Sequence, residues 1–247
     1  MSDPYAKFAY DYDEFGDISD YLGDEKDFFE ALFKEYGVRS VLDCACGTGQ
    51  HLYMMNRLGL AVEGSDYSTP MLEVAKKNMA CKDADIFLKQ CDFRFLESKF
   101  EDTFDAVVCL TNALPHLHTD NDLIMALKSM HSRLNDGGIL VLTSGTTPYT
   151  LAKTPPIEVV VNREDFSRIF VKESKNGFLT IHVLDLFHSA KRTESNQYDI
   201  VNKILFDKDY KRLLEQAGYS GIHFYGDYQM NAFENDTSRR IIVVAEK

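Results

Sequence analysis

The chain has 247 residues, with 27 Lys and Arg against 39 Asp and Glu, which gives a formal net charge of −12. We expect no nucleic-acid partner, because a phosphate backbone is held by clustered Lys and Arg and the sequence has only isolated basic pairs such as Lys76-Lys77. An apolar fraction of 45% is ample for a packed core, and we expect no membrane partner, since no stretch is long and apolar enough to span a bilayer.

The N-terminus and the cysteines indicate a cytoplasmic protein. The first residues are acidic and aromatic, which is typical of neither a secretory nor a mitochondrial leader. Five cysteines are an odd number, and they include no Cys-x-x-Cys pair, so we expect small buried thiols in the reduced state and no metal site.

Residues 1–36 predict an N-terminal lid and a helix. Residues 3–22 are dense in Tyr and Phe among acids, which fits either a tail with a few rings tucked onto the body or a lid that closes over a ligand. A helix capped by Asp24 is expected to run to about Tyr36. Its buried face carries Phe28, Phe29, Leu32 and Phe33 at helical spacing.

Residues 37–150 alternate apolar strands with amphipathic helices. The expected strands are 40–43, 61–66, 86–91, 104–110 and 139–143, and the expected helices are 51–60, 69–79 and 120–133. This alternation predicts an α/β fold with a doubly wound, mostly parallel sheet covered on both faces. The carboxyl ends of such strands meet at one edge, where ligands bind.

After a Thr- and Pro-rich loop at 146–156, the pattern changes to antiparallel β structure. Strands are expected at 167–172, 178–187 and 197–206, and Lys175-Asn176-Gly177 is a strong hairpin-turn signal. A helix capped by Asp207 and two strands, 222–228 and 240–245, then complete the first domain. The expected organisation is therefore 37–150 with 205–247 as one ligand-binding domain and 151–204 as an inserted antiparallel β meander.

The chemistry starts where the strand at 40–43 ends. Asp43 is followed at once by Cys44-Ala45-Cys46-Gly47-Thr48-Gly49, a turn whose glycines leave room for a bound group. The third glycine of a pyrophosphate binder is missing, and Asp43 repels phosphate but suits a cationic amino group. An NAD-dependent dehydrogenase is therefore disfavoured.

Two more acids stand at successive strand ends. Asp66 follows the second strand a little over twenty residues after the turn, a spacing that places a carboxylate on ribose hydroxyls. Asp92 and Phe93 follow the third strand and pair an acceptor with a flat ring, which suits adenine. The expected ligand is an adenosine that carries an ammonium group.

These motifs, together with Asn135-Asp136-Gly137-Gly138, resemble those of class I S-adenosylmethionine-dependent methyltransferases. The resemblance implies a Rossmann-like fold, with S-adenosyl-L-methionine as cofactor and S-adenosyl-L-homocysteine as product. It also implies a set of cofactor-binding residues: Asp43, Ala45, Gly47, Thr48, Gly49, Asp66, Tyr67, Met71, Cys91, Asp92, Phe93, Leu110 and Thr111.

Within that superfamily the chain is similar to glycine/sarcosine N-methyltransferases. The segment 112–117 resembles their Asn-Ser-Phe-x-His-Leu, and residues 21–24 are similar to their Tyr-Ile-Gly-Asp. The resemblance implies Tyr21, Asn112 and His116 as candidate catalytic residues, and residues 151–204 as a cover over the substrate.

One departure concerns the substrate carboxylate. Those enzymes often place an arginine just after the fifth strand to clamp it, but residues 144–149 contain none. Either another cation takes this role or the substrate is not an amino acid. The candidate cations are Arg163, Arg168, Arg192 and Arg239.

The sequence therefore predicts methyl transfer to a small molecule, best the amine of glycine, sarcosine or a similar small amine. One alternative is O-methylation of a hydroxyl or carboxyl metabolite, in which His116 would serve a hydroxyl acceptor as general base. Another is a non-catalytic S-adenosylmethionine-binding regulatory protein. A homo-oligomer is compatible with the sequence.

Overall fold

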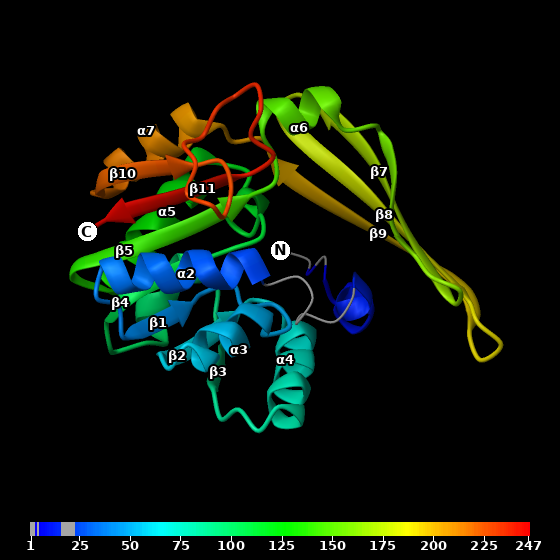
Figure 1. Ribbon diagram of the computed structural model, residues 1–247, viewed down its shortest axis with the longest axis horizontal. Helices are drawn as coiled ribbons and strands as arrows, with labels where there is room; N and C mark the ends of the chain where they lie inside the picture. The colour runs from blue at the N-terminus through cyan, green and yellow to red at the C-terminus, as the bar shows by residue number, and fades with distance from the viewer. Residues whose placement is uncertain (1–2, 4, 16–22) are drawn as a thin grey trace.

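The computed structural model describes residues 3, 5–15 and 23–247, whose strands form two separate sheets (Figure 1). The larger sheet has the strand order β10-β11-β5-β4-β1-β2-β3. Its strands are β1 (Ser40–Asp43), β2 (Ala61–Asp66), β3 (Phe87–Gln90), β4 (Phe104–Cys109), β5 (Leu134–Ser144), β10 (Ser220–Tyr225) and β11 (Ile241–Glu246). The strands from β3 to β5 pair in parallel, and β11 pairs antiparallel with β5 and β10. The predicted doubly wound, mostly parallel sheet is confirmed.

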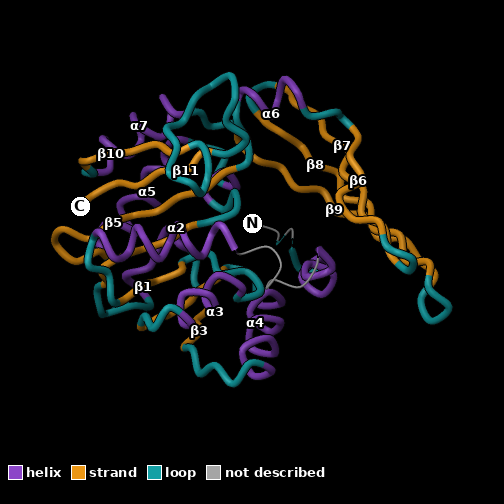
Figure 2. The backbone as a smooth tube through the Cα atoms, viewed as in Figure 1, coloured by secondary structure: helices purple, strands orange, loops and turns teal. Residues whose placement is uncertain are grey.

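Helices lie on both faces of this sheet (Figure 2). The α-helices are α2 (Gly23–Glu35), α3 (Gln50–Arg57), α4 (Thr69–Cys81), α5 (Asp120–Ser132), α6 (Pro148–Lys153) and α7 (Asp207–Ala217), and the short 3-10 helices are η1 (Phe8–Phe15), η2 (Phe93–Ser98) and η3 (Leu114–His116). Buried residues of α5 and α7 pack with Leu42 and Val107, whereas those of α2, α3 and α4 pack with Val41 and Val108. Successive strand residues thus enter opposite cores, which explains why the parallel strands are apolar throughout.

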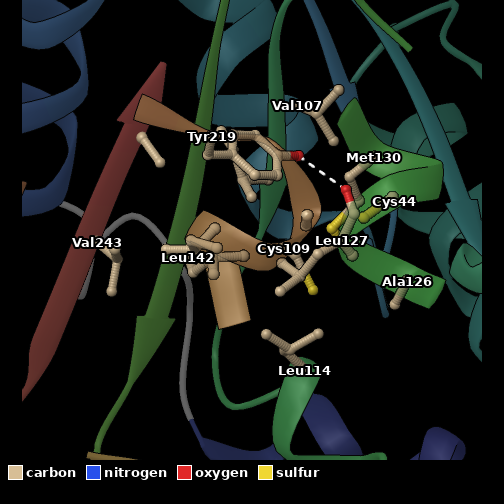
Figure 3. Packing of buried hydrophobic residues seen from close by; sticks show 14 of the residues in the cluster. Cys44, Val107, Cys109, Leu114, Ala126, Leu127, Met130, Leu142, Tyr219 and Val243 are labelled. Atoms are coloured by element: carbon tan, nitrogen blue, oxygen red, sulfur yellow. Dashed lines mark hydrogen bonds between the residues drawn. The ribbon is translucent and has the colours of Figure 1, made fainter. Parts of the chain in front are cut away.

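Figure 3 shows the core on the α5 side of the sheet. The hydroxyl of Tyr219 donates to the carbonyl oxygen of Leu127 at 3.0 Å, so this ring is buried with its polar end satisfied. Cys44 and Cys109 lie in the same cluster as buried thiols. All five cysteines are free, as expected, but Cys81 is exposed because it ends α4, beyond the buried face of that helix.

The smaller sheet is the inserted meander, with the strand order β6-β7-β8-β9 (Figure 1). Its strands are β6 (Ile157–Asn162), β7 (Phe166–Lys175), β8 (Phe178–His188) and β9 (Thr193–Lys203), all paired antiparallel. The predicted turn between β7 and β8 is confirmed, with Asn176 and Gly177 at φ 53° and 81°. The first strand, β6, was not predicted.

Four local predictions were wrong. Asp24 lies inside the first turn of α2 and is not its N-cap. Residues 148–153 form α6 instead of a loop, because Thr147 and Thr150 close a capping box and Pro148 suits the first turn. Strand β5 begins at Leu134, since the expected turn at 135–138 is a bulge in the pairing with β4. The N-cap of α7 is Phe206, whose amide donates to Asp209, and Asp207 lies inside the helix.

The N-terminal segment, residues 5–15, lies between the two sheets (Figure 1). Phe8 packs with Val183 and Tyr198 of the smaller sheet, and Tyr10 donates to Glu73 of α4. A buried pair fixes the same contact: Arg168 binds Asp185 at 2.6 Å and donates to the carbonyl oxygen of Asp11. Of the helices that the structure describes, none combines the length and apolarity needed to cross a bilayer.

Candidate functional site

A cavity of about 620 Å³, here the larger cavity, opens at the carboxyl ends of the parallel strands. It is bordered by the turn after β1, the end of β2 and the loops after β3 and β4. Most of the expected site residues line it: Ala45, Gly47, Thr48, Asp66, Tyr67, Met71, Asp92, Phe93, Leu110, Thr111 and His116. The parallel topology thus brings together residues from four separate strand ends.

Four other expected residues do not line this cavity: Asp43, Gly49, Cys91 and Asn112. Asp43 is buried below the turn and accepts a hydrogen bond from the amide of Ala45 at 3.1 Å. Gly49 is the N-cap residue of α3, and Cys91 is buried in the core. Asn112 lines a second cavity, and Tyr21 lies outside the described residues.

The glycine turn is held by Asp66. The amide of Gly47 donates to one oxygen of this carboxylate at 2.9 Å, and the amide of Ser68 donates to the other at 2.8 Å. Gly47 has φ 53°, and nothing lies within 4 Å of the position a Cβ would take, so the backbone is open to a ligand. Gly49, at φ 85°, instead faces Met79 and Ala75 of α4, where a Cβ would be crowded.

The two carboxyl groups below the turn are tuned by burial. Burial raises the pKa of Asp43 to about 7 and that of Asp66 to about 6, and the charge of Asp66 adds to the shift at Asp43. Backbone hydrogen bonds to each carboxylate oppose the shift. A cationic ligand beside these groups would favour their charged forms, so this end of the cavity suits an ammonium or sulfonium group.

At the opposite wall, Asp92 and Phe93 lie side by side in the lining. Asp92 also binds Arg94 at 2.6 Å, and Arg94 continues to Asp122 of α5 at 2.6 Å. This chain of charges fixes the carboxylate next to the ring. An ionised carboxylate can accept several hydrogen bonds, so Asp92 retains acceptor capacity for an adenine amino group.

Sequence reasoning missed an ion pair in the same lining. His51 in the first turn of α3 lies 3.1 Å from Glu25 of α2, and both face the cavity. Burial acts to lower the pKa of His51, but the hydrogen bond and charge of Glu25 outweigh it and raise that pKa. The signal in the sequence was the position of His51, two residues after Gly49.

The candidate residue His116 pairs with the N-terminal segment. Its Nε2 lies 2.8 Å from the hydroxyl of Tyr5, and Tyr5 and Tyr12 both line the cavity. Burial, with a smaller effect from His118, lowers the pKa of His116 to about 4, and burial raises the pKa of Tyr5 well above its ordinary value. Both side chains are therefore neutral at pH 7.

Two aspartates of the N-terminal segment tie the larger cavity to the smaller sheet. Asp13 accepts hydrogen bonds from the turn residue Thr48 at 2.7 Å and from Asn78 of α4 at 2.8 Å. Asp11 accepts from Tyr198 at 2.8 Å and from Arg192 at 3.0 Å, both on the meander side. The N-terminal segment therefore connects the glycine turn after β1 to the inserted sheet.

A second cavity of about 510 Å³, here the smaller cavity, lies between α6, the turns after β4 and β5, and the four-stranded sheet. Asn112 lines it, and its Oδ1 accepts from the hydroxyl of Ser144 and the amide of Gly145 at 2.8 and 2.9 Å. Thr111 and Asn112 both have positive φ, 54° and 65°, which non-glycine residues adopt only when their surroundings impose it. This turn separates the two cavities.

The four arginines considered for a carboxylate clamp line neither cavity in the described structure. Arg163 pairs with Glu14 and Asp165, Arg168 is buried with Asp185, and Arg192 pairs with Asp11 and Glu194. Arg239 is exposed and lies over the ring of Tyr149. Within residues 3, 5–15 and 23–247, no cluster of three or more His, Cys, Asp or Glu is placed to hold a metal ion.

Comparison with known proteins finds similarity to methyltransferases, as the motifs in the sequence predicted. A family model described as a methyltransferase domain matches residues 41–138. The glycine/sarcosine N-methyltransferase of Parasynechococcus marenigrum is 31% identical over 85% of this chain and 73% of its own length, and that of Aphanothece halophytica is 29% identical over 86% and 78%. A crystal structure of an S-adenosylmethionine-dependent methyltransferase from Clostridium acetobutylicum superposes with a TM-score of 0.83, at 17% identity and 99% coverage of both chains.

Proposed function

We propose a function from one premise: the chain belongs to the class I S-adenosylmethionine-dependent methyltransferases. S-adenosylmethionine is therefore its co-substrate, and the methyl acceptor is a small molecule. The further proposal is that the acceptor atom is an amine nitrogen. Glycine and sarcosine are the first candidates, because they are the substrates that the names of the two relatives above state.

One observation carries the proposal: the larger cavity unites an open glycine turn with carboxylates at successive strand ends. In the proposed complex Asp66 accepts the ribose hydroxyls, and Asp92 with Phe93 frames the adenine. The turn around Gly47 then faces the methionine part, whose amino group is cationic, and Asp43 lies buried below this turn. The acidic lining suits such a ligand and disfavours a phosphate.

Methyl transfer from a sulfonium is an in-line displacement: the acceptor nitrogen forms the new bond to carbon as the sulfur–carbon bond breaks. A neutral amine already has the lone pair that it needs, so the protein contributes mainly by positioning and by excluding water. The half-buried pair of Tyr5 and His116 supplies neutral polar groups at the cavity wall. These groups can orient an amine without adding a charge that would repel the sulfonium.

The test is a binding measurement followed by an acceptor screen. The purified protein is titrated with S-adenosylmethionine and with S-adenosylhomocysteine by calorimetry, and then incubated with S-adenosylmethionine and a panel of amines, amino acids and phenols. We expect heat from both ligands and a mass gain of one or more methyl groups on an amine. An absence of binding heat, or methylation of phenols alone, would overturn the proposal.

A second candidate, O-methylation of a hydroxyl, is favoured by the contact between Tyr5 and His116. A hydroxyl acceptor needs a general base, and His116 has a free proton-accepting form across neutral pH. The burial that lowers its pKa to about 4 makes it a weak base, however. A pH–rate profile with an inflection near pH 4 that is lost in His116→Ala would support this candidate against amine methylation.

The same proposal assigns the enzyme to the cytoplasm, where its five free cysteines would stay reduced. It leaves a homo-oligomer open to measurement by sedimentation or light scattering.

A further inference from the structure

The smaller cavity contains a buried amide that the protein itself does not satisfy. Asn202 on β9 is only 3% exposed and lines this cavity. Among the residues that the structure describes, its Oδ1 is a buried side-chain oxygen without a hydrogen-bond partner. Buried polar atoms are almost always paired, because an unpaired one costs stability. An amide at this position therefore indicates a ligand that supplies the missing hydrogen bond.

The charges around this cavity are already balanced. Lys172 on β7 lies 2.6 Å from Glu158 on β6, and both line the cavity. A carboxylate ligand would have to displace Glu158 from Lys172, whereas an uncharged group can bind beside the pair without disturbing it. The other polar side chains in the lining are uncharged: Asn112, Thr146, Thr150, Thr154, Ser174 and Asn202. The lining therefore favours an uncharged polar ligand.

The size of the cavity points in the same direction. About 510 Å³ lies within the range of about 300–1,000 Å³ that is typical of sites for drug-sized ligands. Apolar side chains of the sheet, including Phe170, Leu179 and Ile181, form part of the wall. A molecule as small as glycine would fill little of this space, so a larger body with both polar and apolar surface fits better.

The position of the cavity connects it to methyl transfer. Thr111 lines the larger cavity, and Asn112, the next residue, lines the smaller one. Their strained turn is held by three contacts: the amide of Thr111 to the hydroxyl of Thr143, the amide of Asn112 to the carbonyl oxygen of Thr143, and the amide of Gly145 to Asn112. A ligand body in the smaller cavity can thus present one end across a fixed turn to the methyl donor.

We propose that the smaller cavity is the acceptor subsite, and that it takes an amine whose body is uncharged and rich in hydroxyl or amide groups. Asn202 recognises that body, and the amine nitrogen crosses the turn at Thr111 and Asn112. The inference rests on the proposed methyltransferase function and names its substrate class. It also explains why none of the four candidate arginines is placed as a carboxylate clamp.

The first test compares acceptors on the intact protein saturated with S-adenosylmethionine. The amines with an uncharged, hydroxylated body are 1-amino-1-deoxysorbitol and 2-amino-1,3-propanediol. The amines that carry a carboxylate are glycine and sarcosine. We expect kcat/KM for 1-amino-1-deoxysorbitol to exceed that for glycine by about tenfold or more, since a site built around hydrogen bonds rejects a ligand that cannot make them. Equal or faster methylation of glycine overturns the inference and leaves the proposed function standing. Failure of every amine, with or without cofactor binding, counts against both.

The second test changes Asn202. In Asn202→Leu we expect KM for the hydroxylated amine to rise about tenfold, with kcat and the Kd for S-adenosylmethionine unchanged. The melting temperature should rise by about 2–4 °C, because an unpaired amide has been removed. Asn202→Thr, which suits a strand and replaces the amide by one hydroxyl, should show a smaller rise in KM. An unchanged KM in both variants overturns the inference.

Two further variants test whether a change in KM comes from the amide of Asn202 itself. Gln197→Leu removes an exposed amide from the same strand and should leave both KM and melting temperature unchanged. Lys172→Met removes the cation from the lining and should raise KM by about threefold at most. If Lys172→Met is instead more damaging than Asn202→Leu, the acceptor is bound through a negative charge and the inference is wrong.

Discussion

The two cavities on either side of the Thr111–Asn112 turn are built in different ways. In the larger one, the carboxylates have partners within the protein: Asp66 accepts from Gly47 and Ser68, and Asp92 binds Arg94. In the smaller one, side chains come from several strands and a short helix, and Asn202 is left unpaired. The polar groups of the larger cavity are therefore held in place for one kind of ligand. In the smaller cavity, a substitution of a single lining side chain could change which ligand binds. In our proposal, the parallel sheet therefore determines which cofactor binds, and the insertion determines which acceptor binds.

The largest expected effect lies in the inserted sheet. Arg168 and Asp185 are both fully buried and bind each other at 2.6 Å. In Arg168→Met the carboxylate of Asp185 is left unpaired, and we expect a loss of about 3–5 kcal/mol in the free energy of unfolding, measured by urea denaturation. The double variant Arg168→Met with Asp185→Leu should recover most of this loss. A single variant that loses less than about 1 kcal/mol would show that the pair does not hold the insertion.

The next effect concerns the cofactor side. Asp66→Ala removes the carboxylate that holds Gly47 and that we assign to the ribose. The affinity for S-adenosylhomocysteine, measured by calorimetry, should fall by about 30- to 100-fold, since a hydrogen bond to a charged group contributes about 1.5–3 kcal/mol. Asp227→Ala removes a partly exposed carboxylate outside the cavity lining, so this variant is the control and should bind normally. Equal affinities in the two variants would contradict the assignment of Asp66.

The affinity for S-adenosylmethionine should depend on pH, because Asp43 and Asp66 change between protonated and ionised forms near neutral pH. The pKa values of Asp43 and Asp66 are raised to about 7 and about 6, so both carboxyls lose protons as the pH rises from about 5.5 to 7.5. Because a cationic ligand favours the anions, the Kd for S-adenosylmethionine should fall over this window, by up to about tenfold per pH unit for each group.

The ligand-free protein should respond in the opposite direction. Its folded state binds protons at pH values where the unfolded chain, with ordinary carboxyl pKa values, has released them. The contribution of these two carboxyls to the melting temperature without ligand should therefore fall as the pH rises from about 4 to 7, and the contribution of Asp43 is measured as the difference from Asp43→Asn. Asp43→Asn should flatten the upper part of both curves, and a Kd independent of pH would contradict the role given to these carboxyls.

The smallest effect concerns the contact between the N-terminal segment and His116. Tyr5→Phe removes the hydroxyl that lies 2.8 Å from His116, and we expect kcat to fall about fivefold, corresponding to about 1 kcal/mol. Tyr10→Phe is the matched control, because Tyr10 is exposed and its hydroxyl binds Glu73 outside the cavity lining. A similar loss in both variants would mean that the segment as a whole, and not the hydroxyl of Tyr5, affects turnover.

The cofactor side was predictable from the sequence because its signals are local. The positions of Gly47, Asp66 and Asp92 follow from strand ends and turns of a few residues, and parallel pairing then brings them to one edge. The sequence also marked His116, although its partner Tyr5 was not identified among the N-terminal rings.

The acceptor side was not predictable in the same way. Strand β6 follows two prolines and lies at the edge of its sheet, where its apolar residues Ile157 and Val159 remain exposed. The sequence therefore lacks the alternation of buried apolar and exposed polar residues that would have predicted this strand. Asn202 is an ordinary polar residue in a β run, and only the packing of four strands and α6 around it reveals that its amide is buried. The sequence marked Asn112 as a candidate catalytic residue. Its side chain lines the smaller cavity instead of the larger one, in a turn where Thr111 and Asn112 both have positive φ.

The bridging N-terminal segment has a consequence for how the protein is made. Asp11 is separated by 181 residues from Arg192 and by 187 from Tyr198, two of the side chains that bind it. A growing chain releases Asp11 early but supplies those partners only when most of its length has left the ribosome. Contacts of such long sequence separation form slowly, so the cofactor end of the enzyme should acquire its aromatic wall only after both sheets have folded.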